Sequence, residues 1–444
     1  MRIVIVCYDF PPVNRSASLR PYGWAKYWSR SGVEVKVVTT PRMRPGLPRN
    51  PIHLYPDLSA IEVIEADHLA PLGWITRWRN RGSPMTGGGV PREEGAGGWE
   101  SALQTVKHRS RTAMNALGTG SLVSIPNLWI APAVKAIRRL HTWWPFDVLV
   151  STFGPAACHI IAAAARRHLS FYWVADYRDL WGGGDLLPVR WPFSSWQNAQ
   201  ERRTVQSADL LTTISEPFVR YLEDRFPGKE VLLVENGFDF EESEPAALRS
   251  KATPAKIQLV YTGTISLQHR DPEPLLLALQ QLVEENPAAA DRLEVVFYTS
   301  DGQAVKEMQQ RPGLGRILRW GGYLSRPEIL AVQRSADGLI FLDWDNPQVR
   351  GVLTGKLFEY LSSGAPLLSI GGHEGADASQ LIVENGFGVA FGKDAEAIYR
   401  CLRDWINGHP VRYTPDHRLV ERFSRGAQAD RLLGEVKNRL TNAN

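Results

Sequence analysis

Cysteine, long apolar runs and net charge are all scarce in this 444-residue sequence. Its three cysteines, Cys7, Cys158 and Cys401, lie far apart and form no CxxC pair or cysteine–histidine spacing, which argues against a zinc site. No apolar run approaches the roughly 18 residues that a membrane-spanning helix needs. The formal net charge is only +4, so the composition does not favour a nucleic-acid-binding protein.

The N-terminus also lacks what a signal peptide requires. The stretch "MRIVIVCYDFPP" has one arginine and then an apolar run that is too short for a signal-peptide core and has no small-residue cleavage site. A first buried strand explains this run better. We therefore expect a cytoplasmic protein whose cysteines are reduced core thiols.

Two series of apolar strands alternating with helical segments run through the chain. The first series is expected at residues 2–10, 33–40, 61–66, 147–152, 171–179, 209–214 and 230–236. The second is expected at residues 257–263, 292–300, 316–322, 337–344, 366–370 and 387–391. This alternation predicts an α/β fold with two doubly wound, Rossmann-like domains, and ligands should bind in a cleft beyond the carboxyl ends of the strands.

Composition places the domain change at a polar, proline-bearing stretch near residues 240–256. We expect an N-terminal domain at residues 1–240 and a C-terminal domain at residues 257–415. Residues 416–444 show helical spacing and are expected to form a C-terminal helix that crosses back to the first domain.

A basic insertion interrupts the first domain at about residues 71–142. It has ten lysines and arginines against three acidic residues, together with four tryptophans. One interpretation is a variable surface insertion. The other is a basic, acceptor-facing or membrane-facing surface, because basic amphipathic helices with nearby tryptophan bind anionic membranes. The second interpretation predicts peripheral contact with the inner face of the membrane.

A charged pair at the start of an expected helix singles out the stretch "TGKLFEYLSSGAPLL", residues 354–368. We expect Thr354 to cap this helix, Gly355 to let a ligand approach the backbone, and Lys356 with the free N–H groups to bind a phosphate. Glu359 would accept hydrogen bonds from sugar or ribose hydroxyls, because an ionised carboxylate only accepts. The alternative is a surface ion pair between Lys356 and Glu359.

Five stretches together resemble a known enzyme family. They are "YDFPP" (8–12), "WVADYRDLW" (173–181), "VENGFD" (234–239), "YTGTI" (261–265) and residues 354–368. In this order they resemble the two-domain (GT-B) glycosyltransferases of the family 4-like group, which use nucleotide sugars. The resemblance covers nearly the whole chain, and "DYRDLW" with "GKLFEYLSSGAP" carries most of it.

The resemblance implies that the first domain, residues 1–240, binds the acceptor and that the second, residues 257–415, binds the nucleotide sugar. Glu359 matches the glutamate that holds the nucleotide ribose, and Lys356 with the backbone of residues 353–355 matches the diphosphate cradle. Arg270 is the nearest candidate for a cation that stabilises the departing diphosphate. Trp320 and Tyr323 are either nucleobase contacts or core side chains. The expected donor-binding residues are Gly263, Thr264, Arg270, Trp320, Tyr323, Leu353, Thr354, Gly355, Lys356 and Glu359.

One departure from the family pattern concerns the donor sugar. Many family members carry a second glutamate eight residues before the ribose-binding one, and here that position is Gly351. The identity of the sugar is therefore open. Asn346, Gln348 and Arg350, in the neighbouring "DNPQVRG", are candidates to replace the missing contact.

The acceptor side is expected where "WVADYRDLW" ends. Asp179 or Asp176 would act as a base or orient the acceptor hydroxyl, and Arg178 would hold a phosphate or the partner carboxylate. The alternative is an internal arginine–aspartate ion pair that shapes the loop. His159, at the start of an expected helix, is a weaker candidate, and a structural role suits it better.

These patterns predict a glycosyltransferase of the hexosyltransferase type that moves a sugar from a nucleotide sugar to a hydroxyl acceptor. Family resemblance and the basic insertion favour a lipid-linked glycan intermediate of cell-surface polysaccharide synthesis, and a small natural product is the alternative acceptor. The resemblance also implies retention of the anomeric configuration. We expect no cofactor beyond the nucleotide-sugar co-substrate and no metal, although "LDWD" (342–345) offers an Asp-x-Asp pair.

Three rival functions differ in how well they fit. A dinucleotide-dependent oxidoreductase requires G-x-G-x-x-G after a strand, and neither "YDFPPVNRSASLR" nor "YTGTISLQHR" provides it. A nucleotide-sugar epimerase or a phosphorylase of the same architecture stays open. So does a non-catalytic scaffold, which the missing glutamate allows.

Overall fold

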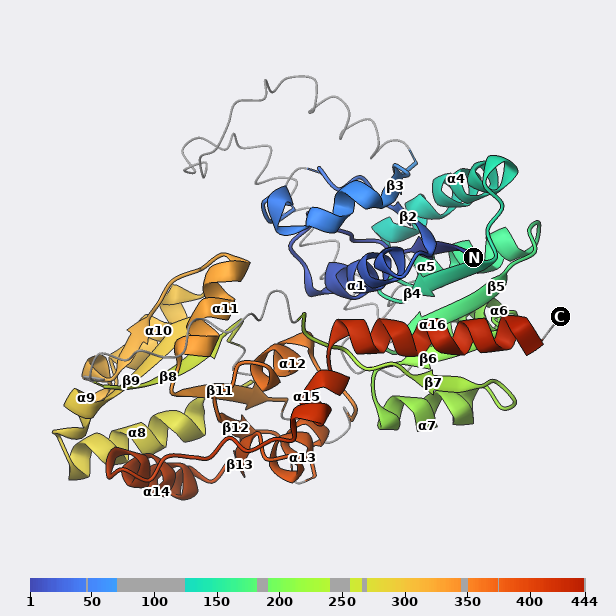
Figure 1. Ribbon diagram of the computed structural model, residues 1–444. Helices are drawn as coiled ribbons and strands as arrows, with labels where there is room; N and C mark the ends of the chain where they lie inside the picture. The colour runs from blue at the N-terminus through green and yellow to red at the C-terminus, as the bar shows by residue number, and fades with distance from the viewer. Residues whose placement is uncertain are drawn as a thin grey trace, which may run out of the picture. The chain divides into compact units, whose positions relative to one another are not determined.

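The computed structural model describes residues 1–44, 47–69, 124–181, 191–239, 256–265, 270–344, 350–373 and 375–442 (Figure 1). The chain forms two compact units, each with its own sheet. Unit 1 comprises Met1–Thr213, Phe218–Leu233 and Glu435–Asn444, and unit 2 comprises Ile214–Pro217 and Val234–Gly434. Unit 2 therefore takes up the chain at Val234, whereas composition places the change near residues 240–256. Most of that stretch lies outside the described residues.

Unit 1 is built on a parallel sheet of seven strands in the order β3-β2-β1-β4-β5-β6-β7. The strands are β1 (Arg2–Val6), β2 (Glu34–Thr39), β3 (Glu62–Glu65), β4 (Val148–Thr152), β5 (Tyr172–Tyr177), β6 (Leu210–Thr213) and β7 (Val231–Leu233). The strand order reverses between β1 and β4, so the loops after these two strands diverge and leave room for a ligand.

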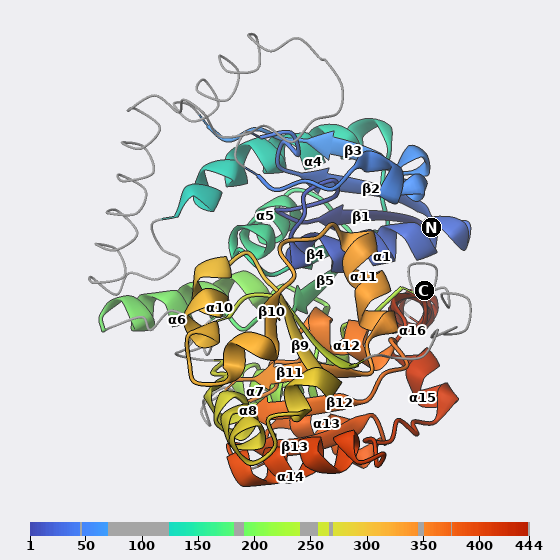
Figure 2. The same ribbon diagram turned by 90° about the vertical axis from the view of Figure 1, so that its left-hand side faces the viewer.

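Helices cover both faces of this sheet because its strands are apolar on both sides. The helices are α1 (Ser16–Arg30), α4 (Ile130–Trp143), α5 (Ala157–Arg166), α6 (Phe193–Val205) and α7 (Glu216–Arg225), with short 3-10 turns at Ile52–Leu54, Pro56–Ala60 and Ile125–Trp129. In β1, Val4 and Val6 face the helices α4 and α5. Figure 2 shows α1 on the other side of the strands.

Unit 2 repeats this plan with six parallel strands in the order β10-β9-β8-β11-β12-β13. The strands are β8 (Ile257–Thr262), β9 (Leu293–Tyr298), β10 (Leu318–Trp320), β11 (Gly338–Asp343), β12 (Leu367–Gly371) and β13 (Gly388–Gly392). The helices are α8 (Glu273–Glu285), α9 (Ala289–Arg292), α10 (Gly302–Gln309), α11 (Arg326–Ser335), α12 (Gly355–Leu361), α13 (Asp377–Glu384) and α14 (Ala395–Ile406), with a 3-10 turn at Leu314–Arg316.

Alternating side chains of β8 enter two separate cores of unit 2. Leu259 and Tyr261 pack with α8 and α14 on one face, whereas Val260 packs with α12 and α13 on the other. This period of two is the reason that apolar runs without polar breaks predict strands buried on both sides. The predicted fold class, two Rossmann-like sheets, is confirmed.

The C-terminal segment differs from the single helix predicted for residues 416–444. It forms two helices, α15 (His417–Arg422) and α16 (Arg425–Asn442). The break falls at Phe423 and Ser424, because Phe423 is buried against Phe358 and Ser424 forms a bridge with Phe238. Residues of α16 up to Gly434 group with unit 2, and those from Glu435 group with unit 1.

Within the described ranges, no helix is both long enough and apolar enough to cross a membrane. Of the basic insertion expected at residues 71–142, only residues 124–142 are described, and they include most of α4. The apolar side of α4, with Ala133, Ile137 and Leu140, is buried in the core of unit 1. Its exposed side carries Lys135, Arg138 and Arg139.

Candidate functional site

Lys356 is the centre of the expected donor site in unit 2. It lies in the first turn of α12, and its amino group donates a 2.8 Å hydrogen bond to the carbonyl of Thr262, the last residue of β8. The ammonium group also lies 4.0 Å from the centre of the Tyr261 ring. Gly263 has φ +126° and would bring a Cβ to 3.3 Å from this amino group, so only glycine fits comfortably between the strand and the lysine.

The charge of Lys356 is costly in the ligand-free protein. Burial lowers the pKa of its amino group well below the usual value, and the nearby Arg270 guanidinium lowers that pKa further, whereas Glu359 acts in the opposite direction. Arg270 lies 5.6 Å from the centre of the Trp344 ring. A bound anion would favour the charged form of Lys356, because it would offset the effects of burial and of Arg270.

Glu359, one turn after Lys356, pairs with two arginines of unit 2. Its Oε1 lies 2.9 Å from Nη2 of Arg326 and 3.8 Å from Nη2 of Arg425. Lys356 therefore bonds to a backbone carbonyl while Glu359 binds arginines, and the alternative of a surface Lys356–Glu359 ion pair is wrong. Sequence reasoning missed both arginines, because they come from α11 and α16, far from Glu359 in the chain.

The backbone before α12 is fixed by two side-chain contacts. Asn236, from the "VENGFD" stretch, donates to the carbonyl of Leu353 at 3.0 Å, and Asp377 accepts from the N–H of Gly351 at 2.6 Å. Thr354 occupies the position before the helix, but its side chain makes no capping hydrogen bond, so the expected cap is wrong. Gly355 begins the helix with open space beside its Cα. Thr264 follows Gly263, and its carbonyl accepts from the Tyr261 hydroxyl at 2.6 Å.

Gly351 cannot simply be replaced by the glutamate of related sequences. Its φ is +78°, a left-handed conformation that strains residues with a Cβ. Of the three candidates for the missing contact, Arg350 is exposed, whereas Asn346 and Gln348 lie outside the described residues.

The two aromatic donor-site candidates lie at the end of the edge strand β10 and just after it, two strands away from β8. Trp320 ends the edge strand β10 and is 43% exposed, and Tyr323 follows it and is 68% exposed. The alternative that they are core residues is therefore wrong. The Trp320 indole donates to the carbonyl of Thr299 at 2.9 Å, which leaves the ring on the surface.

Of the Asp-x-Asp pair at residues 343 and 345, only Asp343 belongs to the described residues. Asp343 ends β11, and burial raises the pKa of its carboxyl group. It accepts hydrogen bonds from the Ser379 hydroxyl at 3.1 Å and from the backbone N–H of Trp344 at 2.7 Å. Asp345 lies outside the described residues. In the part of the chain that the structure describes, no three histidine, cysteine or acidic side chains are grouped to hold a metal.

On the expected acceptor side, Asp176 lies inside β5, not beyond its end, and is fully buried. Arg20 donates to both carboxylate oxygens, at 2.7 and 3.1 Å. The hydroxyls of Thr152 and Thr212 add bonds of 2.7 and 2.8 Å. Four hydrogen bonds saturate this carboxylate, so its surroundings suit an internal ion pair that connects α1 to three strands.

Arg178 and Asp179 follow β5 and lie nearer the surface. Arg178 donates to the carbonyl of Gly154 at 2.8 Å, and its Nε lies 3.7 Å from the Asp179 carboxylate. The Asp179 side chain is 55% exposed, so it stays available to a ligand. His159 is fully buried, bonds to the Ser151 hydroxyl at 2.8 Å, and has its pKa lowered by burial to about 3. These surroundings favour a structural role for His159.

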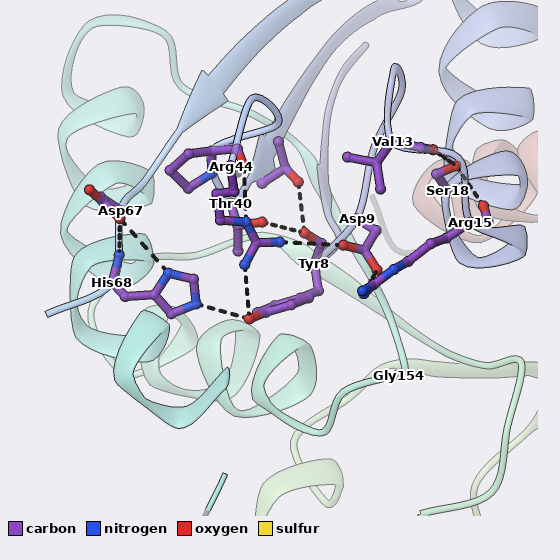
Figure 3. A network of polar contacts seen from close by, with 12 residues as sticks. Tyr8, Asp9, Val13, Arg15, Ser18, Thr40, Arg44, Asp67, His68 and Gly154 are labelled. Atoms are coloured by element: carbon purple, nitrogen blue, oxygen red, sulfur yellow. Dashed lines mark hydrogen bonds and ion pairs between the residues drawn. The ribbon is translucent and has the colours of Figure 1, made fainter. Parts of the chain in front are cut away.

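A polar network after β1 was not singled out by sequence reasoning (Figure 3). Asp9 lies between two arginines, with Arg15 at 3.1 Å and Arg44 at 3.5 Å. Arg44 also donates to the Tyr8 hydroxyl at 3.2 Å, and a His68 ring nitrogen lies 2.9 Å from the same hydroxyl. The only sequence signal was "YDFPP", which contains Tyr8 and Asp9 but neither arginine.

Residues 18–237 match the family model of the glycosyl transferase 4-like domain. No curated protein matches the chain.

Solved structures match over the whole length, at low sequence identity. A glycosyltransferase from Rickettsia africae is 11% identical with a TM-score of 0.65, and the alignment covers 99% of each chain. Sucrose-phosphate synthase from Thermosynechococcus elongatus is 15% identical with a TM-score of 0.61, and all of each chain is covered. A UDP-GlcNAc 2-epimerase from Neisseria meningitidis, solved with UDP-GlcNAc, is 12% identical with a TM-score of 0.54, covering 99% of this chain and 100% of the epimerase. These likenesses show a shared fold.

Proposed function

Because this chain belongs, through residues 18–237, to the glycosyl transferase 4-like family, we propose that it transfers a sugar from a nucleoside-diphosphate sugar to a hydroxyl acceptor. The grouping of Lys356, Arg270 and Glu359 carries the proposal. A buried amine with a lowered pKa beside a guanidinium gains most from a bound diphosphate, and a carboxylate one turn away suits ribose hydroxyls. The related fold that was solved with UDP-GlcNAc supports this class of ligand.

In the proposed reaction, the bond between the sugar C1 and the diphosphate oxygen breaks, and both electrons leave with the diphosphate. Lys356 and Arg270 stabilise the charge that develops there, without a metal. The acceptor oxygen bonds to C1, and its proton passes to a nearby base, for which Asp179 is the accessible candidate in unit 1. Retention of configuration and a lipid-linked acceptor follow from family resemblance. A small natural product is the alternative acceptor.

The donor site can be tested by thermal unfolding with UDP-, GDP-, dTDP- and ADP-sugars. A donor at 100 times its Kd should stabilise the wild type by about 2.7 kcal/mol. Glu359→Gln should remove at least half of this effect, because the amide cannot accept as strongly from two ribose hydroxyls. Glu284→Gln, on the exposed side of α8, is the matched control and should behave as wild type. A wild type that responds to none of the donors would contradict the proposal.

A nucleotide-sugar epimerase is the second candidate function, because epimerases of the same fold are among the similar structures. A transferase should release one nucleoside diphosphate for each sugar moved to an acceptor. An epimerase should instead change the sugar, either on the nucleotide or with release of free sugar, in the absence of any acceptor. Product analysis with the donor found in the thermal screen separates the two, and a scaffold would give no product.

Contact with an anionic membrane is proposed through the exposed side of α4. Because the apolar side of this helix is buried, the attraction should be electrostatic, at about 1 kcal/mol per basic residue near the surface. Replacing Lys135, Arg138 and Arg139 with glutamine should weaken sedimentation with phosphatidylglycerol vesicles at least tenfold. The control is Arg202→Gln with Arg203→Gln, on the exposed side of α6. Equal binding by both variants would rule out α4 as the contact.

A further inference from the structure

The Glu359 carboxylate is held by arginines more firmly than an exposed ion pair would be. Arg326 and Glu359 keep only 15% and 13% of their side-chain surface exposed, and their charged atoms are 2.9 Å apart. Water screens such a pair less than it screens a surface pair. The Arg425 guanidinium is farther away, at 3.8 Å, so Arg326 is the principal partner.

The fold fixes the positions of both residues through Thr262. Gln333 of α11 donates to the Thr262 hydroxyl at 3.1 Å. Tyr360 of α12 accepts from the Thr262 N–H at 2.8 Å and lies 3.0 Å from its hydroxyl. The two helices that carry Arg326 and Glu359 are therefore attached to the same residue at the end of β8.

Arg326 also starts from a rigid position on its own helix. It is the first residue of α11, directly after Ser325. The Glu328 carboxylate accepts from the Ser325 N–H at 2.8 Å and from its hydroxyl at 2.6 Å, which fixes the first turn. The guanidinium can thus orient a carboxylate without much loss of its own freedom.

The shortest contact of each arginine with Glu359 is to the same oxygen, Oε1. We propose that Arg326 is a positioning residue for ribose recognition, which fixes the Glu359 carboxylate so that its remaining acceptor sites accept from the ribose hydroxyls of the donor. This inference rests on the proposed function, because it assigns Glu359 to the nucleotide ribose.

The test compares Arg326→Met and Arg326→Lys with the wild type, using calorimetry with UDP, GDP and ADP. The nucleotide that binds is then replaced by its 2′,3′-dideoxy analogue, which lacks the hydroxyls that Glu359 would read. Arg326→Met should weaken binding of the natural nucleotide by about tenfold, the worth of one charge-assisted hydrogen bond. It should leave the affinity for the dideoxy analogue at the wild-type level, and Arg326→Lys should recover part of the loss. Arg319→Met is the matched control, because Arg319 is an exposed arginine of unit 2 that also pairs with a glutamate.

Each result decides the question. An equal loss for the natural and the dideoxy nucleotide would reduce Arg326 to a structural role, and tighter binding by Arg326→Met would make it a competitor of the ribose. Both outcomes overturn the proposal while leaving the proposed function intact. If the methionine variant does not fold, the ratio of the two affinities in Arg326→Lys gives the same decision. A wild type that binds none of the nucleotides overturns the proposed function as well.

Discussion

Replacing Lys356 with methionine is expected to stabilise the ligand-free protein and to abolish its stabilisation by nucleoside diphosphates. The lowered pKa of Lys356 means that the fold disfavours the charged amine, at about 1.4 kcal/mol for each unit of lowering. Methionine keeps the length and apolar stem of lysine and loses one hydrogen bond, to the Thr262 carbonyl, worth about 1 kcal/mol. Without a bound diphosphate, the relief of the buried charge should outweigh the lost hydrogen bond, so the methionine variant should be the more stable protein.

The gain in stability should depend on pH with a defined sign. Between the lowered pKa of the folded state and the usual value of 10.5, the unfolded wild type binds a proton that the folded one does not. The free energy of unfolding of the wild type therefore rises with pH across that window, relative to the methionine variant. The advantage of methionine is full below the folded-state pKa and fades as the pH approaches 10.5.

Urea unfolding at several pH values, with and without the best nucleoside diphosphate, measures both effects. Lys306→Met, at an exposed position of α10, is the control and should change neither. A Lys356→Met protein that is less stable than wild type at neutral pH, yet responds fully to the nucleotide, would show that Lys356 supports the fold and does not bind the donor.

Asp176→Asn is expected to destabilise the protein by about 3–5 kcal/mol, the usual cost of breaking a buried ion pair from one side. The Arg20 guanidinium is 7% exposed and would lose its counter-charge. The hydroxyls of Thr152 and Thr212 would lose a strong acceptor at the same time. The loss should appear as a lower urea midpoint and as faster hydrogen exchange in β5.

Asp179→Asn tests whether Asp179, rather than the buried Asp176, is the carboxylate that takes part in sugar transfer. The Asp179 side chain is 55% exposed, and its nearest contact with Arg178 is a long one of 3.7 Å. Loss of its charge should therefore lower the free energy of unfolding by less than about 0.5 kcal/mol. If Asp179 is the base, sugar transfer should fall by at least a hundredfold while donor binding stays unchanged. An Asp176→Asn enzyme that folds normally and loses transfer would reverse these two assignments.

The strands of both sheets could be predicted from the sequence, because the pattern that indicates each strand lies within a short stretch of residues. Runs such as "RIVIVCYDF" and "IQLVYTG" are mostly apolar at successive positions, and both become strands with buried residues on both faces. The split of the C-terminal segment was missed, since the break at Phe423 depends on Phe358 and Phe238, which pack there from distant parts of the chain.

At the site, too, contacts between residues far apart in the chain could not be predicted from the sequence. Lys356 and Glu359 stand out because their charges interrupt an apolar helix, but their partners do not stand out. Arg326 lies 33 residues from Glu359, and Arg20 lies 156 residues from Asp176, as their numbers in the sequence show. No periodicity links such pairs, because only the packing of helices on a common sheet brings them together. Asp176 therefore looks catalytic in sequence and structural in its surroundings.

The chain's path through the two units limits how the protein can be divided for study. Unit 1 is not one continuous stretch, because its last residues, Glu435–Asn444, come from the far end of α16. In unit 1, Arg439 of this segment pairs with Glu230. An expressed fragment that stops at residue 239 would omit the helical tail and leave Glu230 without this partner. Half-proteins made by a single cut should therefore be poorly soluble, whereas a circularly permuted gene that joins the two termini would keep unit 1 whole.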